Sequence, residues 1–336
     1  MPPLVLTMGE PAGIGGELAL AAWSRRAAGV PCFALLDDPD RLAKLARRLR
    51  LEVPIRTIED PAEAAAVWGE ALPVLPVRLA GPVVPGTPDP VNAPAVIGAI
   101  ERAVALVSSG AASALVTNPI QKQVLIEAGF SHPGHTEFLA ALAGPGTVPV
   151  MMLTCPGLRV VPITIHQSLK SAIEDLTIEK ILTAARITAA ALKRDFGIKR
   201  PTLAISGLNP HAGEGGAFGR EEIEIIAPAI QTLRDDGLTV EGPLPADTMF
   251  HVKARQRYDA ALCMYHDQAL IPIKTIDFES GVNVTLGLPF VRSSPDHGTA
   301  LNIAGTGKAS AESLIAALVT ADQMARMRAA ARARKA

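Results

Sequence analysis

The stretch LVLTMGEPAGIGGE, residues 4–17, contains a short apolar run, a turn with four glycines and the start of a helical pattern. A buried strand followed at once by a glycine-rich turn and a helix is typical of a parallel α/β sheet. The turn lacks the Lys-Ser/Thr end of a Walker loop and the spacing of a dinucleotide fingerprint. A tight structural turn and a ligand-binding loop therefore both stay open for residues 9–16.

The same alternation continues along the chain. Further strands are expected at 32–36, 114–117, 148–153, 160–165, 203–206, 260–265 and 282–286. Helices are expected at 17–28, 39–50, 94–107, 178–196, 221–235 and 310–332, several of them closed by glycine. The proline-rich segment 72–94 is expected to cross the surface between elements. This order predicts a two-lobed α/β/α sandwich with a mixed, mostly parallel sheet.

Composition limits the class of protein. Of the 336 residues, 49% are hydrophobic and only 4% aromatic, which suits sheets covered by aliphatic helices. The net charge of -1 gives no electrostatic footprint for nucleic acid. Three isolated cysteines predict reduced thiols, and no apolar segment approaches bilayer length, so a cytoplasmic protein with no membrane partner is expected.

Three histidines stand just past expected strands. They are His166 after VVPITI, His211 after TLAISGLNP and His266 after ALCMY. Loops at the carboxyl ends of parallel strands carry ligand-binding side chains, and three imidazoles could hold a divalent metal there. Asp267 adjoins His266, so the two side chains are expected to diverge. For each histidine alone, a hydrogen-bonded loop imidazole is the competing interpretation.

Other polar clusters also follow apolar runs. In SHPGHTE, residues 131–137, His135 or Thr136 is expected to cap a helix or to face an anion. The loop 209–220 has four glycines around His211, which suggests a ligand. Asn283 lies within an apolar strand and Arg292 ends the next apolar run, where a guanidinium suits phosphate or carboxylate. Residues 294–307 could wrap a nucleotide or form an ordinary turn.

With these clusters in place, the chain closely resembles the 4-hydroxythreonine-4-phosphate dehydrogenases, NAD-dependent enzymes of pyridoxal phosphate biosynthesis. The matching segments, between residues 9 and 305, are GEPAGIG (9–15), TNPIQK (117–122), GHTEFLA (134–140), NPHAGEGG (209–216), PADTMF (245–250), YHDQ (265–268), GVNVTLGLPFVR (281–292) and DHGTALNIAG (296–305). The last segment also looks like the nucleotide loop of isocitrate and isopropylmalate dehydrogenases. The resemblance therefore covers nearly the whole chain and implies that fold.

The resemblance also implies site residues. A divalent metal (zinc, magnesium or cobalt) is expected on His166, His211 and His266, one of them from the partner subunit of a homodimer whose active site lies at the subunit interface. Substrate contacts carry over to His135, Thr136, Lys274, Asn283 and Arg292. Candidate catalytic residues are Lys274, Asp267 and Asp247. NAD or NADP is expected on Asp296, His297, Gly298, Thr299, Ala300 and Asn302.

The implied reaction is the oxidation and decarboxylation of 4-phosphooxy-L-threonine to 3-amino-2-oxopropyl phosphate. Related dehydrogenases act on 4-phospho-D-threonate, 4-phospho-D-erythronate or aromatic cis-dihydrodiols. A metal-dependent hydrolase and a non-catalytic phospholigand-binding protein are alternatives from other classes. Residues 1–128 with 290–336 are expected to form an NAD-binding lobe, and residues 129–289 a lobe for metal, substrate and dimerisation.

Overall fold

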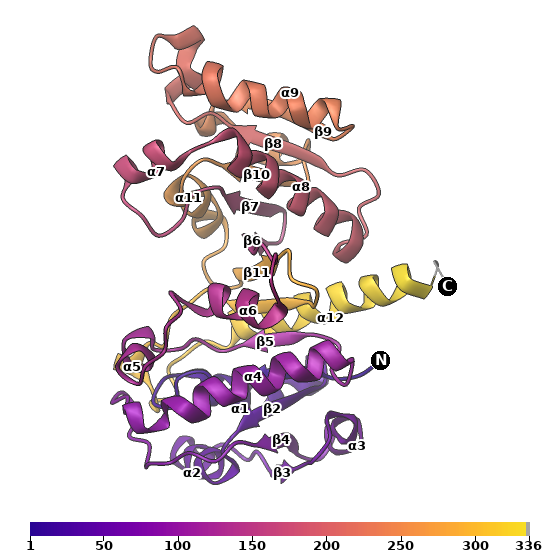
Figure 1. Ribbon diagram of the computed structural model, residues 1–336. Coiled ribbons are helices and arrows are strands. Elements are labelled where there is room, and N and C mark those ends of the chain that lie inside the picture. Colours follow the sequence, from indigo (N-terminus) through magenta and orange to yellow (C-terminus); the bar gives the residue numbers. More distant parts are fainter. Residues whose placement is uncertain (334–336) are drawn as a thin grey trace. The chain divides into compact units, whose positions relative to one another are not determined.

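The structure, a computed structural model, describes residues 1–333 of the chain. Two compact units are formed (Figure 1), unit 1 by residues 1–149 and 288–326 and unit 2 by residues 150–287 and 327 onward. Segment 129–149, grouped with the second lobe in the sequence-based division, packs within unit 1. The functional division into an NAD-binding and a metal-binding lobe stays a prediction.

Unit 1 is built around a parallel sheet. Its elements are β1 (Leu4–Thr7), α1 (Gly15–Ser24), β2 (Phe33–Asp37), α2 (Pro39–Leu49), β3 (Ile55–Thr57), α3 (Ala64–Val67), β4 (Leu72–Pro76), α4 (Ala93–Ser109), β5 (Leu115–Thr117), α5 (Lys122–Glu127), α6 (His135–Ala143), β12 (Arg292–Pro295) and α12 (Glu312–Ala333), which continues into unit 2. The strand order is β3-β4-β2-β1-β5-β12, and each pair of neighbours is parallel. The carboxyl ends of all six strands therefore share one edge.

The start of α2 shows how local chemistry places an element. Asp38 is its N-cap, and the carboxylate accepts the backbone N–H groups of Asp40 and Arg41. Pro39 occupies the first helical position, where its missing N–H costs nothing. A cap of this kind stabilises a helix by about 0.5–2 kcal/mol, so α2 is fixed to begin directly at the end of β2.

Helix α4 covers one face of this sheet. It contacts β1, β2 and β5 and packs beside α6 (Figure 1). By length and composition the segment Pro90–Ser109 could cross a membrane, but residues such as Ile100 and Val104 are buried in the core of unit 1. The apolar character of α4 is that of a helix packed on a sheet.

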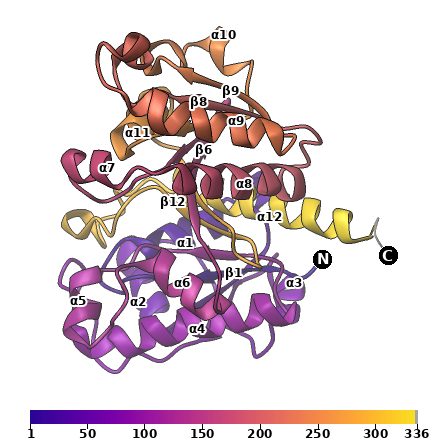
Figure 2. The same cartoon turned by 45° about the horizontal axis from the view of Figure 1, so that its top comes forward.

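Unit 2 has a mixed sheet. Its elements are β6 (Val150–Cys155), β7 (Leu158–Pro162), α7 (Leu169–Asp175), α8 (Ile178–Asp195), β8 (Thr202–Ser206), α9 (Ala227–Asp235), β9 (Thr239–Leu244), α10 (Val252–Arg255), β10 (Ala260–Cys263), α11 (His266–Ile276) and β11 (Val282–Leu286). The order is β11-β6-β7-β10-β8-β9; β6 is antiparallel to both neighbours, and the other pairs are parallel. Helices α8 and α9 lie side by side (Figure 2), and α11 contacts β7 and β10.

The expected fold class, a mixed and mostly parallel α/β sheet, is confirmed in the described residues. The expectation for residues 72–94 is wrong at its start, because β4 is a buried strand between β3 and β2. Leu72, its first residue, and Val77, the residue after it, donate backbone hydrogen bonds, so the ladder tolerates Pro73 and Pro76. Arg292, which closes the apolar run 288–291, is the first residue of β12.

The three cysteines are free, as expected. Cys155 and Cys263 are buried and Cys32 is partly buried. Burial raises the pKa of the Cys155 thiol to about 11, so this thiol stays protonated and inert.

Candidate functional site

The histidine group of unit 2, defined as His166, His211 and His266, lies where the sequence predicts. His166 follows β7, His211 follows β8 and His266 begins α11 directly after β10. Because β7, β10 and β8 are adjacent parallel strands, the three residues leave one edge of one sheet. The strand-end prediction is confirmed.

His166 and His266 face a common pocket. Their ring centroids are 5.8 Å apart, and both line a cavity of about 450 Å³ together with Asp267 and residues at the start of α7. His166 has a φ of +47°, a left-handed conformation that is unusual for a residue with a side chain. Such strained residues cluster at functional sites, so the backbone supports a ligand-binding role for this pocket.

The expectation that His266 and Asp267 diverge is wrong. Nδ1 of His266 lies 2.7 Å from Oδ1 of Asp267. The helix turn at the start of α11 lets the carboxylate fold back on the neighbouring imidazole. Asp267 thus fixes the ring and leaves Nε2 of His266 for a ligand.

His211 has the same type of partner in a different loop. Its Nδ1 is 3.0 Å from Oε2 of Glu214, and this hydrogen bond raises the pKa of the imidazole, with a smaller contribution from nearby Asp247. Residues His211, Ala212 and Glu214 all have positive φ, so the loop is held in a costly conformation. The glycines around them supply the rest of this left-handed turn, as the sequence suggests.

Two residues that the sequence-based reasoning missed hold these loops. The buried carboxylate of Glu222 accepts the backbone N–H groups of Leu208 and Asn209, at 2.8 and 2.7 Å. The buried amide of Gln268 accepts from Ser206 and from the backbone of Met264, both at 2.7 Å. Gln268 therefore ties the ends of β8 and β10 together. Neither residue stands out in the sequence, because Glu222 lies among the acidic residues of segment 221–224 and Gln268 directly follows His266 and Asp267.

The histidine group fits a divalent metal by its donor chemistry. In His266 and His211 the Nδ1 atom faces a carboxylate, which leaves Nε2 as the ligand atom, the arrangement common around protein-bound metals. Within residues 1–333, however, no three His, Cys, Asp or Glu side chains are close enough to hold an ion. His166 and His266 are brought together, while His211 is not grouped with them. The three-histidine metal site stays a prediction.

The arginine group of unit 1 is defined as Thr117, His135 and Arg292. Thr117 and Arg292 are deeply buried and His135 is partly buried. Arg292 is 3% exposed, and its Nη2 donates to the hydroxyl of Thr117 at 2.6 Å. Burial lowers the pKa of Arg292 to about 10, so the guanidinium remains a cation. A buried cation beside a neutral hydroxyl is suited to a phosphate or carboxylate.

His135 lies within the electrostatic range of this cation. Burial, and then the charge of Arg292, lower the pKa of His135 to about 3, so the imidazole is neutral. Its Nε2 is buried and has no hydrogen-bond partner in the described chain. Neither His135 nor Thr136 caps α6, because Gly134 is the N-cap and no side chain bonds there. The capping prediction is wrong, which leaves the anion-facing interpretation.

The remaining substrate candidates lie in unit 2. Lys274 is in the last turn of α11, with Nζ 5.4 Å from the centre of the Phe278 ring. Asn283 lies in β11, and its side-chain oxygen is buried without a hydrogen-bond partner in residues 1–333. An orphaned buried acceptor is costly, so a ligand donor at this point would stabilise the site.

The expected cofactor residues, Asp296 to Asn302, form one loop against the glycine-rich turn. The backbone of Ile14 donates to the carbonyl of Thr299 at 3.1 Å, and the Thr299 hydroxyl donates to Gln121 at 3.1 Å. A Cβ on Gly13 would meet the Thr299 carbonyl at 2.9 Å, so glycine permits this close approach. The turn at 9–16 thus has a structural role. The nucleotide role of the 296–302 loop stays a prediction.

Two of the relatives below share one name, and the third is a different dehydrogenase. 4-Hydroxythreonine-4-phosphate dehydrogenase of Bradyrhizobium diazoefficiens is 57% identical over 334 residues, which cover 96% of this chain and 97% of that protein. A crystal structure with the same name from Klebsiella pneumoniae is 37% identical, with a TM-score of 0.88 and coverage of 97% and 100%. A terephthalate 1,2-cis-dihydrodiol dehydrogenase from Burkholderia xenovorans is 30% identical, with a TM-score of 0.65 and coverage of 96% and 98%.

Fold, site and relatives together define an oxidoreductase of the α/β class. More particularly, residues 31–321 match the family model of the pyridoxal phosphate biosynthetic protein PdxA. The chain belongs to that family.

Proposed function

We propose that this protein oxidises and decarboxylates 4-phosphooxy-L-threonine with NAD as the acceptor, in the biosynthesis of pyridoxal phosphate. One observation carries the proposal, namely that relatives of this activity match the chain almost end to end at up to 57% identity. The arginine group supports it physically, because a buried guanidinium beside a neutral histidine suits an anionic, phosphorylated substrate.

The reaction has two steps. Loss of the hydroxyl proton and transfer of hydride from the same carbon to NAD give NADH and 2-amino-3-oxo-4-phosphooxybutanoate. This β-keto acid loses its carboxylate as CO2, and the electron pair of the broken bond forms an enolate. Uptake of one proton at carbon then gives 3-amino-2-oxopropyl phosphate.

Each residue is assigned a role that its surroundings allow. Arg292, His135 and Thr136 hold anionic groups of the substrate, with His135 acting as a neutral donor because its pKa is lowered to about 3. Asn283 contacts the substrate through its orphaned oxygen. Lys274 accepts the hydroxyl proton, and Asp267 or Asp247 are the other candidates for this step.

Two further groups complete the site. A divalent ion on His166, His211 and His266 (zinc, magnesium or cobalt) would supply Lewis-acid activation of the substrate hydroxyl, and NAD or NADP would accept the hydride. The residues Asp296, His297, Gly298, Thr299, Ala300 and Asn302 contact the cofactor. A cytoplasmic homodimer, with one histidine of each metal site from the partner and the active site at the subunit interface, completes the proposal.

The experiment is a substrate comparison in steady state. Purified protein is mixed with NAD and with magnesium, zinc or cobalt in turn, and NADH absorbance is followed with 4-phosphooxy-L-threonine or 4-phospho-D-threonate. Production of NADH and CO2 in equal amounts, with the L-threonine derivative preferred, supports the proposal. Turnover without a nicotinamide, or preference for the D-threonate, contradicts it.

The metal assignment has its own test. His211→Ala should lose metal-stimulated NADH production and weaken zinc binding in calorimetry, because one ligand is removed. His251→Asn, which alters an exposed histidine with no assigned role in the same unit, is the control. Full turnover by the His211→Ala variant after treatment with a chelator would contradict the assignment.

A further inference from the structure

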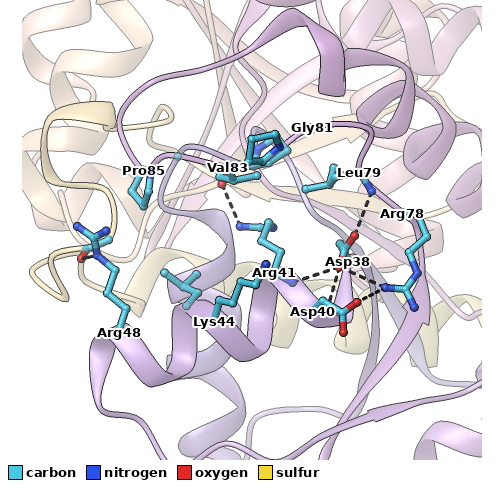
Figure 3. A pocket seen from close by; sticks show the side chains of 15 residues that line it. Asp38, Asp40, Arg41, Lys44, Arg48, Arg78, Leu79, Gly81, Val83 and Pro85 are labelled. Carbon is cyan, nitrogen blue, oxygen red and sulfur yellow. Dashed lines mark hydrogen bonds and ion pairs between the residues drawn. The ribbon is translucent and has the colours of Figure 1, made fainter.

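Two cavities lie beside residues with expected roles. The cavity of unit 1, about 600 Å³, is bounded by α2, by the segment after β4 and by Gly305, which follows the expected cofactor loop (Figure 3). The cavity of unit 2 is lined by His166 and His266, and Thr164 lies on its wall. Thr164 and the buried residues next to it have no role in the reaction as proposed above, yet they join the strands that carry the histidine group.

The ends of β7 and β10 are joined by a buried hydroxyl. Oγ1 of Thr164 donates to the backbone carbonyl of Met264 at 2.8 Å, and both residues are buried. Thr164 stands two residues before His166, and Met264 stands two residues before His266. The hydrogen bond therefore holds the two backbone segments together just before each imidazole leaves them.

The ends of β10 and β8 are joined by Gln268. Its Oε1 accepts the N–H of Met264 and the hydroxyl of Ser206, and its Nε2 donates to the carbonyl of Gly207 at 2.8 Å. A backbone N–H can only donate and a carbonyl can only accept, so these partners fix which way round the amide lies. Gln268 is 8% exposed, and a buried polar network whose bonds are made is rigid.

The link to β8 extends into the loop that carries His211. A Cβ on Gly207 would lie 2.8 Å from Cα of Ala212, so the backbone of Gly207 is in close contact with the residue after His211. The N–H of Gly207 donates to the carbonyl of Leu244 at 2.8 Å, and its carbonyl is held by Gln268. A shift of Gly207 would therefore move the backbone next to His211.

We propose that Thr164, Ser206 and Gln268 are positioning residues for the divalent metal. Through Met264 they form one hydrogen-bonded network from the end of β7 across β10 to β8. This network sets the spacing of the backbone segments from which the side chains of the histidine group project. Groups that lie behind the ligands of a metal site commonly change metal affinity roughly 10- to 100-fold when they are removed. The inference rests on the proposed function for the metal site itself.

Calorimetry with zinc alone tests the link between β7 and β10, on the full chain after a chelator has removed bound metal. Thr164→Val keeps the shape of the side chain but loses the hydroxyl, and it should weaken zinc binding about tenfold or more. Thr164→Ser keeps the hydroxyl and loses a methyl group, so it should bind zinc as tightly as the unaltered protein.

Gln268→Met tests the link between β10 and β8, because methionine has nearly the same length and lacks the amide. It should also weaken zinc binding about tenfold or more. Asp259→Ala is the matched control. Oδ2 of Asp259 accepts the N–H of Thr202 at 2.8 Å, so it joins the same two strands at their amino ends, away from the histidine group. Asp259→Ala should bind zinc like the unaltered protein.

Urea unfolding of the same proteins separates positioning from stability. Gln268→Met and Asp259→Ala should both lower the free energy of unfolding, because each removes a side-chain acceptor of a backbone N–H. Only Gln268→Met should lose zinc affinity as well. If Gln268→Met does not fold, the two Thr164 variants decide the question, since Thr164→Val removes a single hydrogen bond.

Two results would overturn the positioning role. One is unchanged zinc affinity in Thr164→Val, and the other is a loss of affinity in Asp259→Ala equal to that in Gln268→Met. Absence of zinc binding by the unaltered protein also overturns it, whereas equal amounts of NADH and CO2 from 4-phosphooxy-L-threonine would still support the reaction. If zinc affinity depends on Thr164 and Gln268 but no NADH forms, the proposed reaction fails and the positioning role stands.

Discussion

At the scale of single residues, Arg292 and His135 oppose each other electrostatically. Burial, and then the charge of Arg292, favour the neutral imidazole and lower the pKa of His135 to about 3. The guanidinium itself donates to the uncharged hydroxyl of Thr117. An anion bound at this point would offset part of the free-energy cost of burying the guanidinium.

Arg292→Lys tests this interpretation directly. Lysine keeps the charge but loses the planar fork that donates to Thr117 and to an anion together. KM for the phosphorylated substrate should rise by roughly 10- to 100-fold, because a charge-assisted hydrogen bond of about 1.5–3 kcal/mol is lost. Arg186→Lys, at an exposed pair with Asp236, is the control. An unchanged KM would exclude Arg292 from the anion site.

The pKa of His135 also predicts how stability depends on pH. Its folded value of about 3 lies below the ordinary 6.5, so between these values the unfolded chain binds more protons. Its contribution to the free energy of unfolding is present above pH 6.5 and is lost by at most about 1.4 kcal/mol per pH unit as the pH falls toward 3. Urea titrations at pH 7.5 and 5.0 measure how much the free energy of unfolding falls between these two pH values. This fall should be roughly 2 kcal/mol smaller for His135→Gln than for the unaltered protein. His132→Gln is the control and should behave like the unaltered protein. An equal fall in the free energy of unfolding for His135→Gln and the unaltered protein would contradict this pKa.

For single residues, the sequence predicts well where the site residues lie along the chain, but it predicts their hydrogen-bond partners poorly. His166, His211 and His266 follow strands as expected, because an apolar run ending at a polar residue marks the strand end. The hydrogen bond between His266 and Asp267 depends on the side-chain conformations at the start of α11, and the role of Glu222 depends on where the backbone of residues 208–209 lies. Such conformations arise from tertiary contacts, and no local pattern encodes them.

At the scale of elements, a buried ion pair joins α8 to α12. Arg328 donates from Nε and Nη2 to the two oxygens of Asp195, at 2.8 and 2.9 Å, and Arg194 donates to the same carboxylate. Burial alone would raise the pKa of Asp195, but these two arginines hold it below its ordinary value. The pair therefore fixes the C-terminal part of α12 within unit 2.

Arg328→Leu should therefore destabilise the protein by about 3–5 kcal/mol, since it leaves a buried carboxylate with one fewer partner. The matched control is Arg326→Leu on the same helix, whose partner Asp322 is reached at 2.7 Å on the surface. This exposed pair should contribute only about 0–1 kcal/mol. Equal losses in chemical unfolding would show that burial does not decide the strength of these pairs.

Strands are predicted accurately where their sequence is a clear apolar run, and poorly where it is not. The sequence predicts β11 at its observed bounds, 282–286, because it is a short apolar run between polar or glycine-containing turns. Strand β4 carries two prolines and β12 reads Arg-Ser-Ser-Pro, so neither has the composition of a central strand. Both are strands because parallel neighbours supply the backbone partners, which is information that lies outside the segment.

At the scale of the whole molecule, the alternation of strands and helices was enough to predict the α/β class. It predicts a mixed, mostly parallel sheet but not which strand is antiparallel, because the antiparallel placement of β6 depends on its pairing with β11, from a segment more than 100 residues away. The fold class depends on patterns within short windows, whereas sheet order depends on which distant segments meet.

The proposed homodimer gives a prediction at this scale. Unit 2 exposes large apolar side chains on and after α11, with Ile271 64% and Phe278 77% exposed. Apolar groups of this size on a surface are typical of an interface between subunits. Light scattering should therefore give a mass of twice 35.1 kDa for the unaltered protein.

The double variant Ile271→Asp with Phe278→Asp should have the mass of a single chain. The free-energy cost of burying two carboxylates in an apolar interface exceeds the free energy gained from its contacts. Val84→Asp changes an apolar residue of unit 1 that is 59% exposed, and it should leave the dimer intact. If a histidine of each metal site comes from the partner, the dissociated variant should also lose zinc affinity in calorimetry while it keeps NADH binding. A monomer that retains full zinc affinity would place all the metal ligands in one chain.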